Sequence, residues 1–287
     1  MPDMRIGIIG GSGLYEMEGL SDIKKEEIKT PFGSPSDKYI TGKLNGADMV
    51  FLPRHGIGHR LLPGEINYRA NIYGMKVLGV THIISVSAVG SMKENIAPGH
   101  IVIPNQFIDL TKNRISTFTG NGFVAHVSLA DPICPQLSSN LYEAGLAVGA
   151  TMHKGGTYLC MEGPQFSSRA ESHLYRDWGI DIIGMTNATE AKLAREAEIC
   201  YATVALSTDY DCWHVSEEDV TADAIIKIIQ KNTSTAKELI RKVVSNITPK
   251  RDCGCSSAMQ NAIVTNPSVI PEETKKALKP IIDKYIQ

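Results

Sequence analysis

The chain has 287 residues, 43% of them hydrophobic, and a formal net charge of −2, so it can bury a sizeable core. A charge so close to zero argues against nucleic acid as the main partner, because phosphate backbones are bound by clustered basic faces. The chain has no apolar run of about 18 residues and no signal-peptide pattern at its start, so we expect a cytoplasmic protein without membrane contact.

Strand-like and helix-like segments alternate along the whole chain. The predicted strands cover residues 5–9, 48–52, 82–86, 101–104, 156–161, 181–184 and 199–206. The predicted helices cover residues 66–78, 131–148, 168–178, 188–198, 223–244 and 272–285. This alternation predicts an α/β fold with a largely buried central sheet. No repeat or linker interrupts it, so we expect a single domain over residues 1–287.

The first strand ends in Gly10-Gly11-Ser12-Gly13, which supplies half of a dinucleotide-binding fingerprint. A Rossmann fold requires G-x-G-x-x-G here, but Glu16 occupies the position of the third glycine. This argues against a Rossmann-type methyltransferase or dehydrogenase. The exposed backbone N–H groups and the Ser12 hydroxyl would instead suit an anion.

Further strand ends carry hydroxyls, open backbone amides and an arginine. Ligands bind at the carboxyl ends of strands in open α/β sheets. A dianionic phosphate needs a charge-assisted pair with arginine, and hydroxyl or N–H donors for its other acceptors. The sequence provides these groups at Ser12, Arg54-His55, Ser87-Ala88, Glu162 to Ser167 and Met185-Thr186.

The strand at residues 199–206 leads into two carboxylates, Asp209 and Asp211. An ionised carboxylate only accepts hydrogen bonds, whereas a protonated one also donates. The pair could therefore recognise the amine of adenine and protonate a ring nitrogen. A solvated turn is the alternative, because Asp is common in turns. Taken alone, His55, His126, Phe166 and Met185 could also be ordinary packed residues.

Six cysteines are spread over the chain. Four of them fall in apolar or mixed segments and are expected to be small core residues, namely Cys134, Cys160, Cys200 and Cys212. The loop Cys253-Gly254-Cys255 has no second Cys or His pair at zinc-ligand spacing, so no metal site is expected. Two free thiols or a local disulfide remain the alternatives there.

Five segments together resemble 5′-methylthioadenosine phosphorylase, in the trimeric purine nucleoside phosphorylase group. They are Ile9 to Leu14, Pro53 to Gly56, Ile66 to Asn71, Glu162 to Glu171 and Thr208 to Trp213. The resemblance runs from about residue 5 to about residue 245, and residues 248–287 are less diagnostic. It implies a phosphorylase/hydrolase-like fold with a twisted mixed sheet flanked by helices. Cys253-Gly254-Cys255 is similar to a disulfide-bonded Cys-x-Cys of some thermophilic members.

The resemblance also implies a role for each site residue. Phosphate would be held by Ser12, Arg54, His55, Ser87, Ala88 and Thr186. The nucleoside would be bound by Phe166, Ser167, Met185, Asp209 and Asp211. His126 would reach the active site of a neighbouring subunit in a homotrimer or a dimer of trimers. The family usually has proline where this chain has Thr189.

The implied reaction is phosphorolysis of methylthioadenosine to adenine and 5-methylthioribose 1-phosphate. Phosphate is a co-substrate, and no cofactor or metal is expected. Asp209 would protonate N7, its pKa raised by burial and by Asp211. The 6-oxopurine branch carries Glu at the position of Ser167 and Asn at that of Asp209. A phosphorylase of broader adenosine or 6-oxopurine specificity and a non-catalytic adenine-nucleoside binding module remain the alternatives.

Overall fold

The computed structural model describes residues 4–214 and 222–286, without the side chains at positions 12, 15, 222–227 and 229. Its strands are β1 Arg5–Gly10, β2 Leu20–Glu26, β3 Tyr39–Leu44, β4 Ala47–Pro53, β5 His82–Ser91, β6 Ile101–Ile103, β7 Gln106–Asp109, β8 Met152–Lys154, β9 Thr157–Cys160, β10 Ile182–Gly184 and β11 Cys200–Asp209. Its α-helices are α1 Tyr68–Val77, α2 Pro135–Ala147, α3 Arg169–Asp177, α4 Asn187–Glu196, α5 Ala222–Val244 and α6 Glu272–Ile282. Four 3₁₀ turns are η1 Ser12–Tyr15, η2 Asp211–Trp213, η3 Gly254–Ser257 and η4 Pro267–Val269.

The described strands form one mixed sheet in the order β2-β3-β4-β1-β5-β10-β9-β7, and β11 pairs with β5 and β6. The neighbours β4, β1, β5 and β11 are parallel, so their carboxyl ends meet at one edge. The predicted single-domain α/β fold with a mixed sheet is confirmed. Because η1 and then β2 follow β1, the glycine loop does not begin a Rossmann-type crossover helix.

Strand β5 is the point where the sheet branches. On one side, β1 pairs with β5 only as far as Ser85, and β10 joins antiparallel at Gly90 and Ser91. On the other side, β11 follows β5 from His82 to Gly90. Among the described strands, residues 86–89 of β5 therefore lack a partner on one side, and buried backbone groups there need other partners.

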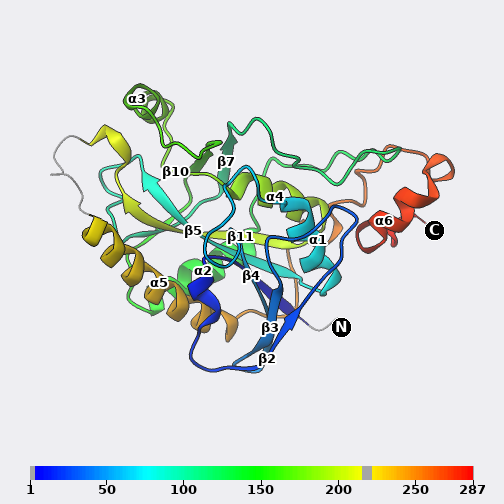
Figure 1. The fold of residues 1–287 in the computed structure, drawn as a ribbon, viewed down its shortest axis with the longest axis horizontal. Coiled ribbons are helices and arrows are strands. Elements are labelled where there is room, and N and C mark those ends of the chain that lie inside the picture. Colours follow the sequence, from blue (N-terminus) through cyan, green and yellow to red (C-terminus); the bar gives the residue numbers. More distant parts are fainter. Residues whose placement is uncertain (1–3, 215–221, 287) are drawn as a thin grey trace.

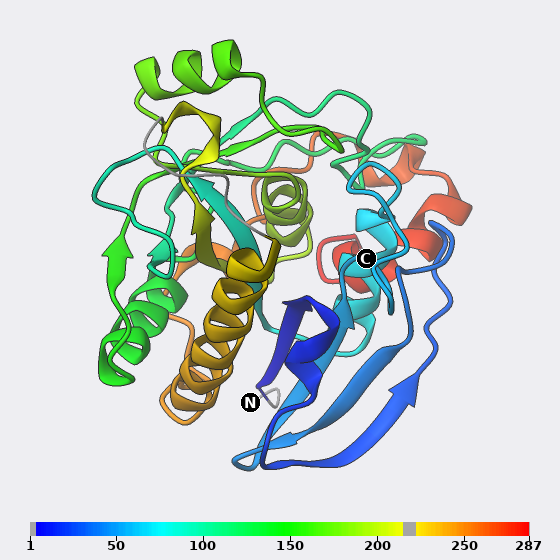
Figure 2. The same ribbon diagram turned by 60° about the vertical axis from the view of Figure 1, so that its left-hand side comes forward.

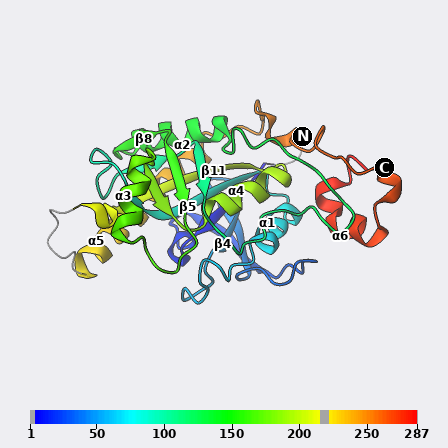
Figure 3. The same cartoon turned by 90° about the horizontal axis from the view of Figure 1, so that it is seen from above.

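Helices cover both faces of the sheet. Figures 2 and 3 show α2 and α5 on one face and α1 and α4 on the other. Helix α3 stands at one end of the sheet, against η2, and α6 lies beside α1 at the opposite end (Figure 1). No helix within residues 4–214 and 222–286 is apolar over a length that would span a bilayer.

Two differences from the predicted elements have local causes. The helix predicted from residue 131 begins at Pro135, because the residue before a proline is driven out of the helical region. Cys134 there is extended and its sulfur accepts the N–H of Leu137 at 3.5 Å. The strands β2, β3, β7 and β8 were not predicted, and β2 is a largely exposed edge strand without apolar alternation.

Gly74 in α1 should not tolerate a side chain. A Cβ atom there would lie 2.1 Å from the hydroxyl oxygen of Tyr39, which is fully buried. Alanine gains about 1 kcal/mol over glycine in a helix, but overpacking a core costs about 1–3 kcal/mol. We expect Gly74→Ala to lower the thermal unfolding midpoint, and Val77→Ala, exposed on the same helix, to change it little. A higher midpoint for Gly74→Ala would show that helix propensity outweighs the clash.

Candidate active site

The sheet brings most of the predicted residues to one edge. Arg54 follows the end of β4, and Gly11 follows the parallel end of β1. The antiparallel register of β10, with Ile183 opposite Gly90, directs the next residues, Met185 and Thr186, toward the middle of β5. The arrowheads of β5 and β11 point the same way, toward α3 (Figure 1). The phosphate and nucleoside groups predicted from sequence therefore lie around the carboxyl half of β5.

Arg54 is the buried charge at this edge, with 3% of its surface exposed. Its Nε donates to Glu190 Oε1 at 2.5 Å, and its Nη2 donates to Glu190 Oε2 at 3.2 Å and Ser85 Oγ at 2.5 Å. Its Nη1 donates to the carbonyl of Val86 at 2.9 Å, within the part of β5 that lacks a strand partner. Burial alone would lower the pKa of Arg54, but the carboxylate of Glu190 outweighs it and raises that pKa.

Glu190 and Asn187, both on α4, were missed as site residues. Glu190 also accepts from Ser85 Oγ at 2.8 Å and from the hydroxyl of Tyr201 at 2.9 Å. Asn187 donates to Ser85 Oγ at 3.0 Å and accepts from Thr186 Oγ1 at 3.0 Å. Asn187 and Glu190 are polar residues at buried positions of α4, but the sequence alone does not show that these positions are buried.

Other predicted phosphate ligands follow members of this network in the chain: His55 follows Arg54, and Ser87 and Ala88 follow Val86 on β5. His55 is half-buried, and its Nδ1 lies 2.8 Å from the carbonyl of Leu61. Burial, together with the charge of Arg54, lowers the pKa of His55 to about 4, so its imidazole is neutral at pH 7. The hydroxyl of Ser87 donates to the carbonyl of Ala88 at 3.3 Å, and Ala88 is exposed. The side chain of Ser12 lies outside the described part of the structure, although its backbone forms η1.

The two aspartates lie together at the end of β11. Asp209 Oδ1 accepts the N–H of Asp211 at 2.8 Å, and Asp209 Oδ2 accepts from Thr208 Oγ1 at 2.7 Å. Asp211 Oδ2 accepts from Ser172 Oγ of α3 at 2.7 Å. Burial, and to a lesser extent the charge of Asp209, raises the pKa of Asp211. In sequence analysis, the raised pKa was expected at Asp209.

Gly90 leaves room for Asp209. A Cβ atom on Gly90 would lie 3.1 Å from Asp209 Oδ1 and 3.1 Å from a side-chain carbon of Ile183. Both contacts are tighter than ordinary van der Waals packing. The absence of a side chain on β5 at this point therefore lets the carboxylate lie against the sheet.

The segment before α3 closes on the aspartates. Ser168, rather than Ser167, caps α3 in a capping box with Glu171. The carbonyl of Ser167 accepts from the thiol of Cys212 at 3.4 Å, next to Asp211. Phe166 is 83% exposed and so is not a core residue. An exposed aromatic ring beside a polar site is suited to cover a flat apolar ligand.

Arg114 is a further residue that sequence analysis missed. Its side chain is almost fully buried, and its Nε donates to Glu162 Oε1 at 3.1 Å. Its Nη1 donates to the carbonyl of Met185 and to the hydroxyl of Tyr68. Arg114 therefore holds the backbone carbonyl of Met185 in place. No motif marked it, because it comes from a long irregular segment.

His126 does not join this group within one chain. Its side chain is exposed, and its backbone N–H donates to the carbonyl of Ala262 at 2.8 Å in the C-terminal region. The neighbouring Ala125 forms an isolated bridge with Ile263. The role of His126 in a neighbouring subunit's site stays a prediction.

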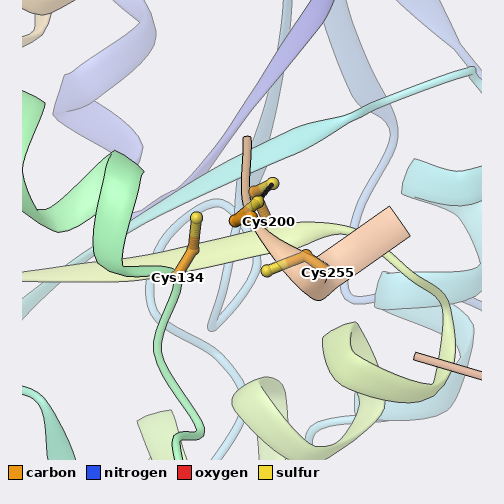
Figure 4. A group of neighbouring side chains, drawn as sticks. Cys134, Cys200 and Cys255 are labelled. Atoms are coloured by element: carbon orange, nitrogen blue, oxygen red, sulfur yellow. Dashed lines mark hydrogen bonds between the residues drawn. The ribbon is translucent and has the colours of Figure 1, made fainter. Parts of the chain in front are cut away.

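Cys134 and Cys200 are buried core residues, as expected, and both lie in a cluster with the Cys-x-Cys turn. The sulfur atoms of Cys134, Cys200, Cys253 and Cys255 all lie within 4.8 Å of one another. Figure 4 shows three of them meeting from the start of α2, from β11 and from the C-terminal turn. The structure has all six cysteines as free thiols. The missing second pair is formed by two cysteines that are far apart in sequence, so spacing could not reveal it.

The Arg54–Glu190 pair should be required for folding stability. We expect Glu190→Gln to lower the thermal unfolding midpoint by about 5–10 °C, because breaking a buried ion pair costs about 3–5 kcal/mol. Glu196→Gln is the matched control, on the same helix and also buried. Glu196 accepts from Thr117 and Phe118 and has no ion-pair partner among the described residues. Equal losses in the two variants would show that burial, not charge pairing, sets the effect.

Comparison with known proteins gives this arrangement a family. A family model of the phosphorylase superfamily matches residues 5–245. An S-methyl-5′-thioadenosine phosphorylase of Geobacter sulfurreducens is 64% identical over 282 residues, 98% of this chain and 99% of that protein. A protein of the same name from Hyperthermus butylicus is 49% identical and covers 90% of this chain and 95% of its own length.

Solved structures agree with the sequence relatives. A methylthioadenosine phosphorylase from an Antarctic soil metagenomic library superimposes with a TM-score of 0.94 at 50% identity, covering 98% of this chain and 99% of that one. A mutant adenosine/methylthioadenosine phosphorylase from Schistosoma mansoni, in complex with methylthioadenosine, gives 0.79 at 34% identity, covering 86% and 93%. The chain belongs to the phosphorylase superfamily.

Proposed function

We propose that this enzyme cleaves 5′-methylthioadenosine with inorganic phosphate, giving adenine and 5-methylthioribose 1-phosphate. The observation that carries the proposal is the paired Asp209 and Asp211 beside the buried Arg54 network on the two adjacent strands β11 and β5. Relatives as similar as 64% over nearly the full chain are named for this activity. Inorganic phosphate is the co-substrate, and the reaction as proposed requires no cofactor.

The phosphate end combines one charge with neutral donors. Among the described residues, Nη1 of Arg54 has a single acceptor, Val86, which leaves its second N–H for a phosphate oxygen. The hydroxyls of Ser12, Ser87 and Thr186 and the backbone of Ala88 are the further donors in this proposal. A neutral His55 that donates from Nδ1 to Leu61 keeps a lone pair on Nε2, which can accept the O–H of monoprotonated phosphate.

Charge explains how phosphorolysis would proceed. Phosphate attacks C1′ as the bond to the base stretches, and the ribose becomes cation-like. The bound phosphate stabilises that cation electrostatically. Electrostatic stabilisation of the transition state is usually the largest single contribution to enzymatic rate enhancement. Arg114 holds the carbonyl of Met185, and the backbone of Met185 would bind the ribose hydroxyls.

At the base end, the proton is held by the pair of aspartates rather than by one residue. Asp209 accepts two hydrogen bonds from the protein, whereas burial raises the pKa of Asp211. Asp209 would deliver the proton to N7, with Asp211 held beside it by the hydrogen bond from its N–H. Ser167 would lie beside the base, and Phe166 would cover it.

Assembly as a homotrimer, or as a dimer of such trimers, is part of the proposal. His126 is exposed and flanked by exposed apolar residues, with Val124 43% and Val264 67% exposed. These two valines are joined by a backbone hydrogen bond of 2.9 Å, so they lie together. An apolar surface of this kind suits a subunit interface. From such an interface, His126 would close the methylthio end of a neighbour's site.

The reaction is tested by its dependence on phosphate. Purified protein supplied with methylthioadenosine should release adenine only when phosphate is present, and the sugar product should carry the phosphate. Equal release without phosphate would identify a hydrolase. Binding without any release would identify a binding module.

Base specificity is tested at the two positions that face the purine. A 6-oxo group would place one acceptor against another, so inosine and methylthioinosine should be about 10⁴-fold poorer substrates. Asp209→Asn should lower the rate on methylthioadenosine about 10²–10⁴-fold, because the acid is lost. Combined with Ser167→Glu, it should improve 6-oxopurine turnover relative to the unmodified enzyme. Equal cleavage of inosine and methylthioadenosine by the unmodified enzyme would rule out this recognition.

Assembly is tested by sedimentation at the concentration used for the assay. We expect a trimer or a multiple of it, and His126→Ala should weaken methylthioadenosine binding while the assembly stays intact. Val124→Asp, placed in the exposed apolar surface, should instead dissociate the subunits and lower activity with them. A fully active monomer would contradict both the interface and the role of His126.

A further inference from the structure

Cysteines from three distant parts of the chain meet at the end of the sheet opposite the active site. Cys134 caps the start of α2, and Cys200 is the first residue of β11. Cys253 and Cys255 lie at the C-terminal turn η3. Three of the four are buried, and Cys253 is partly exposed. The group thus combines four of the six cysteines in one place, although they span more than 120 positions of the sequence.

The spacing of the four sulfur atoms matches a tetrahedral metal site. Zinc–sulfur bonds of about 2.3 Å place the sulfur atoms of a tetrahedron about 3.8 Å apart. The four sulfur atoms here all lie within 4.8 Å of one another, and those of Cys200 and Cys253 are 3.4 Å apart. We propose that Cys134, Cys200, Cys253 and Cys255 bind one zinc ion.

The surroundings of the cluster supply donors to sulfur. The backbone N–H of Leu137, in the first turn of α2, donates to Cys134 Sγ at 3.5 Å. Arg195 Nη1 lies 3.9 Å from Cys255 Sγ. Such outer contacts orient thiolate ligands and compensate the negative charge that four of them carry. The guanidinium of Arg195 would have no negative charge to compensate if the four thiols were uncharged.

The ligand set selects the kind of ion. Four thiolates in a tetrahedral arrangement suit zinc, whereas magnesium and calcium require oxygen ligands. Four protein ligands leave no open position for water or substrate, which is the mark of a structural site. Cys200 begins the strand that ends at Asp209, so the ion would lie at the other end of β11 from the chemistry.

The segment that the ion would hold is also fastened beside the cluster. Glu198, two residues before Cys200, accepts from the N–H of Met259 at 3.0 Å, and its carbonyl accepts from Arg251 at 3.2 Å. Gln136, two residues after Cys134, accepts the N–H of Asp252 at 3.0 Å. The C-terminal segment is thus held on both sides of the Cys-x-Cys turn. Zinc would lock that attachment by joining it to α2 and β11.

The first test is the metal content of the unmodified protein. Protein produced without an affinity tag that binds metals and dialysed against metal-free buffer should contain about one zinc per chain by mass spectrometry. Removing zinc with a strong chelator should lower the thermal unfolding midpoint, and adding zinc should restore it. Metal-free protein with six free thiols, or with disulfides among the four cysteines, would overturn the proposal. Stoichiometric iron would overturn zinc as the ion.

Variants identify the ligands. Cys253→Ser, at the partly exposed position, should lose most of the zinc, about tenfold or more, while Cys160→Ser should keep it. Cys160 is the matched control, because it is a fully buried cysteine outside the cluster. At low temperature, where it is folded, Cys253→Ser should cleave methylthioadenosine at the normal rate. On heating, it should lose activity at a lower temperature than the unmodified enzyme. Full zinc content in Cys253→Ser would exclude this site, whatever the outcome for the proposed reaction.

Discussion

The active-site edge depends on how one buried charge fills a gap in the sheet. Between the points where β1 leaves β5 and β10 joins it, the backbone of β5 has no strand partner on one side. The guanidinium of Arg54 enters there and donates to Val86. A buried cation needs a counter-charge, and Glu190 provides it from α4. The start of α4 is thereby held next to β5, and Thr186 and Asn187 with it.

The same strands connect the two ends of the proposed substrate. β5 carries Ser87 and Ala88, which are proposed to bind phosphate, and its Gly90 pairs in register with Asp209 on β11. Since the two strands are parallel neighbours, the distance between phosphate and base sites is fixed by the sheet. Helix α3 adds Ser172, which holds Asp211, and the loop before it adds Ser167. The proposed catalytic aspartates at the end of β11 are thus contacted by groups on α3 and on the loop before it.

The two ends of β11 serve different purposes in this interpretation. Its carboxyl end carries the aspartates, and its amino end carries Cys200 in the cysteine cluster. A fastening at the amino end can stabilise the strand and the C-terminal segment without approaching the substrate. Exposed residues such as Phe166 can then lie near the carboxyl end of β11, while the cysteine cluster would stabilise the fold at its amino end.

The sequence by itself determined the α/β class, most of the strands and helices, and the residues at the strand ends, because hydrophobic periodicity and strand-end motifs are local. It did not predict the exposed edge strand β2, which lacks an apolar pattern. Only the tertiary structure decided the partners: Glu190 for Arg54, Arg114 for Met185, and Cys134 with Cys200 for the Cys-x-Cys turn. These partners lie roughly 50 to 140 residues apart in the sequence. Their burial and charge pairing arise only when the chain is folded.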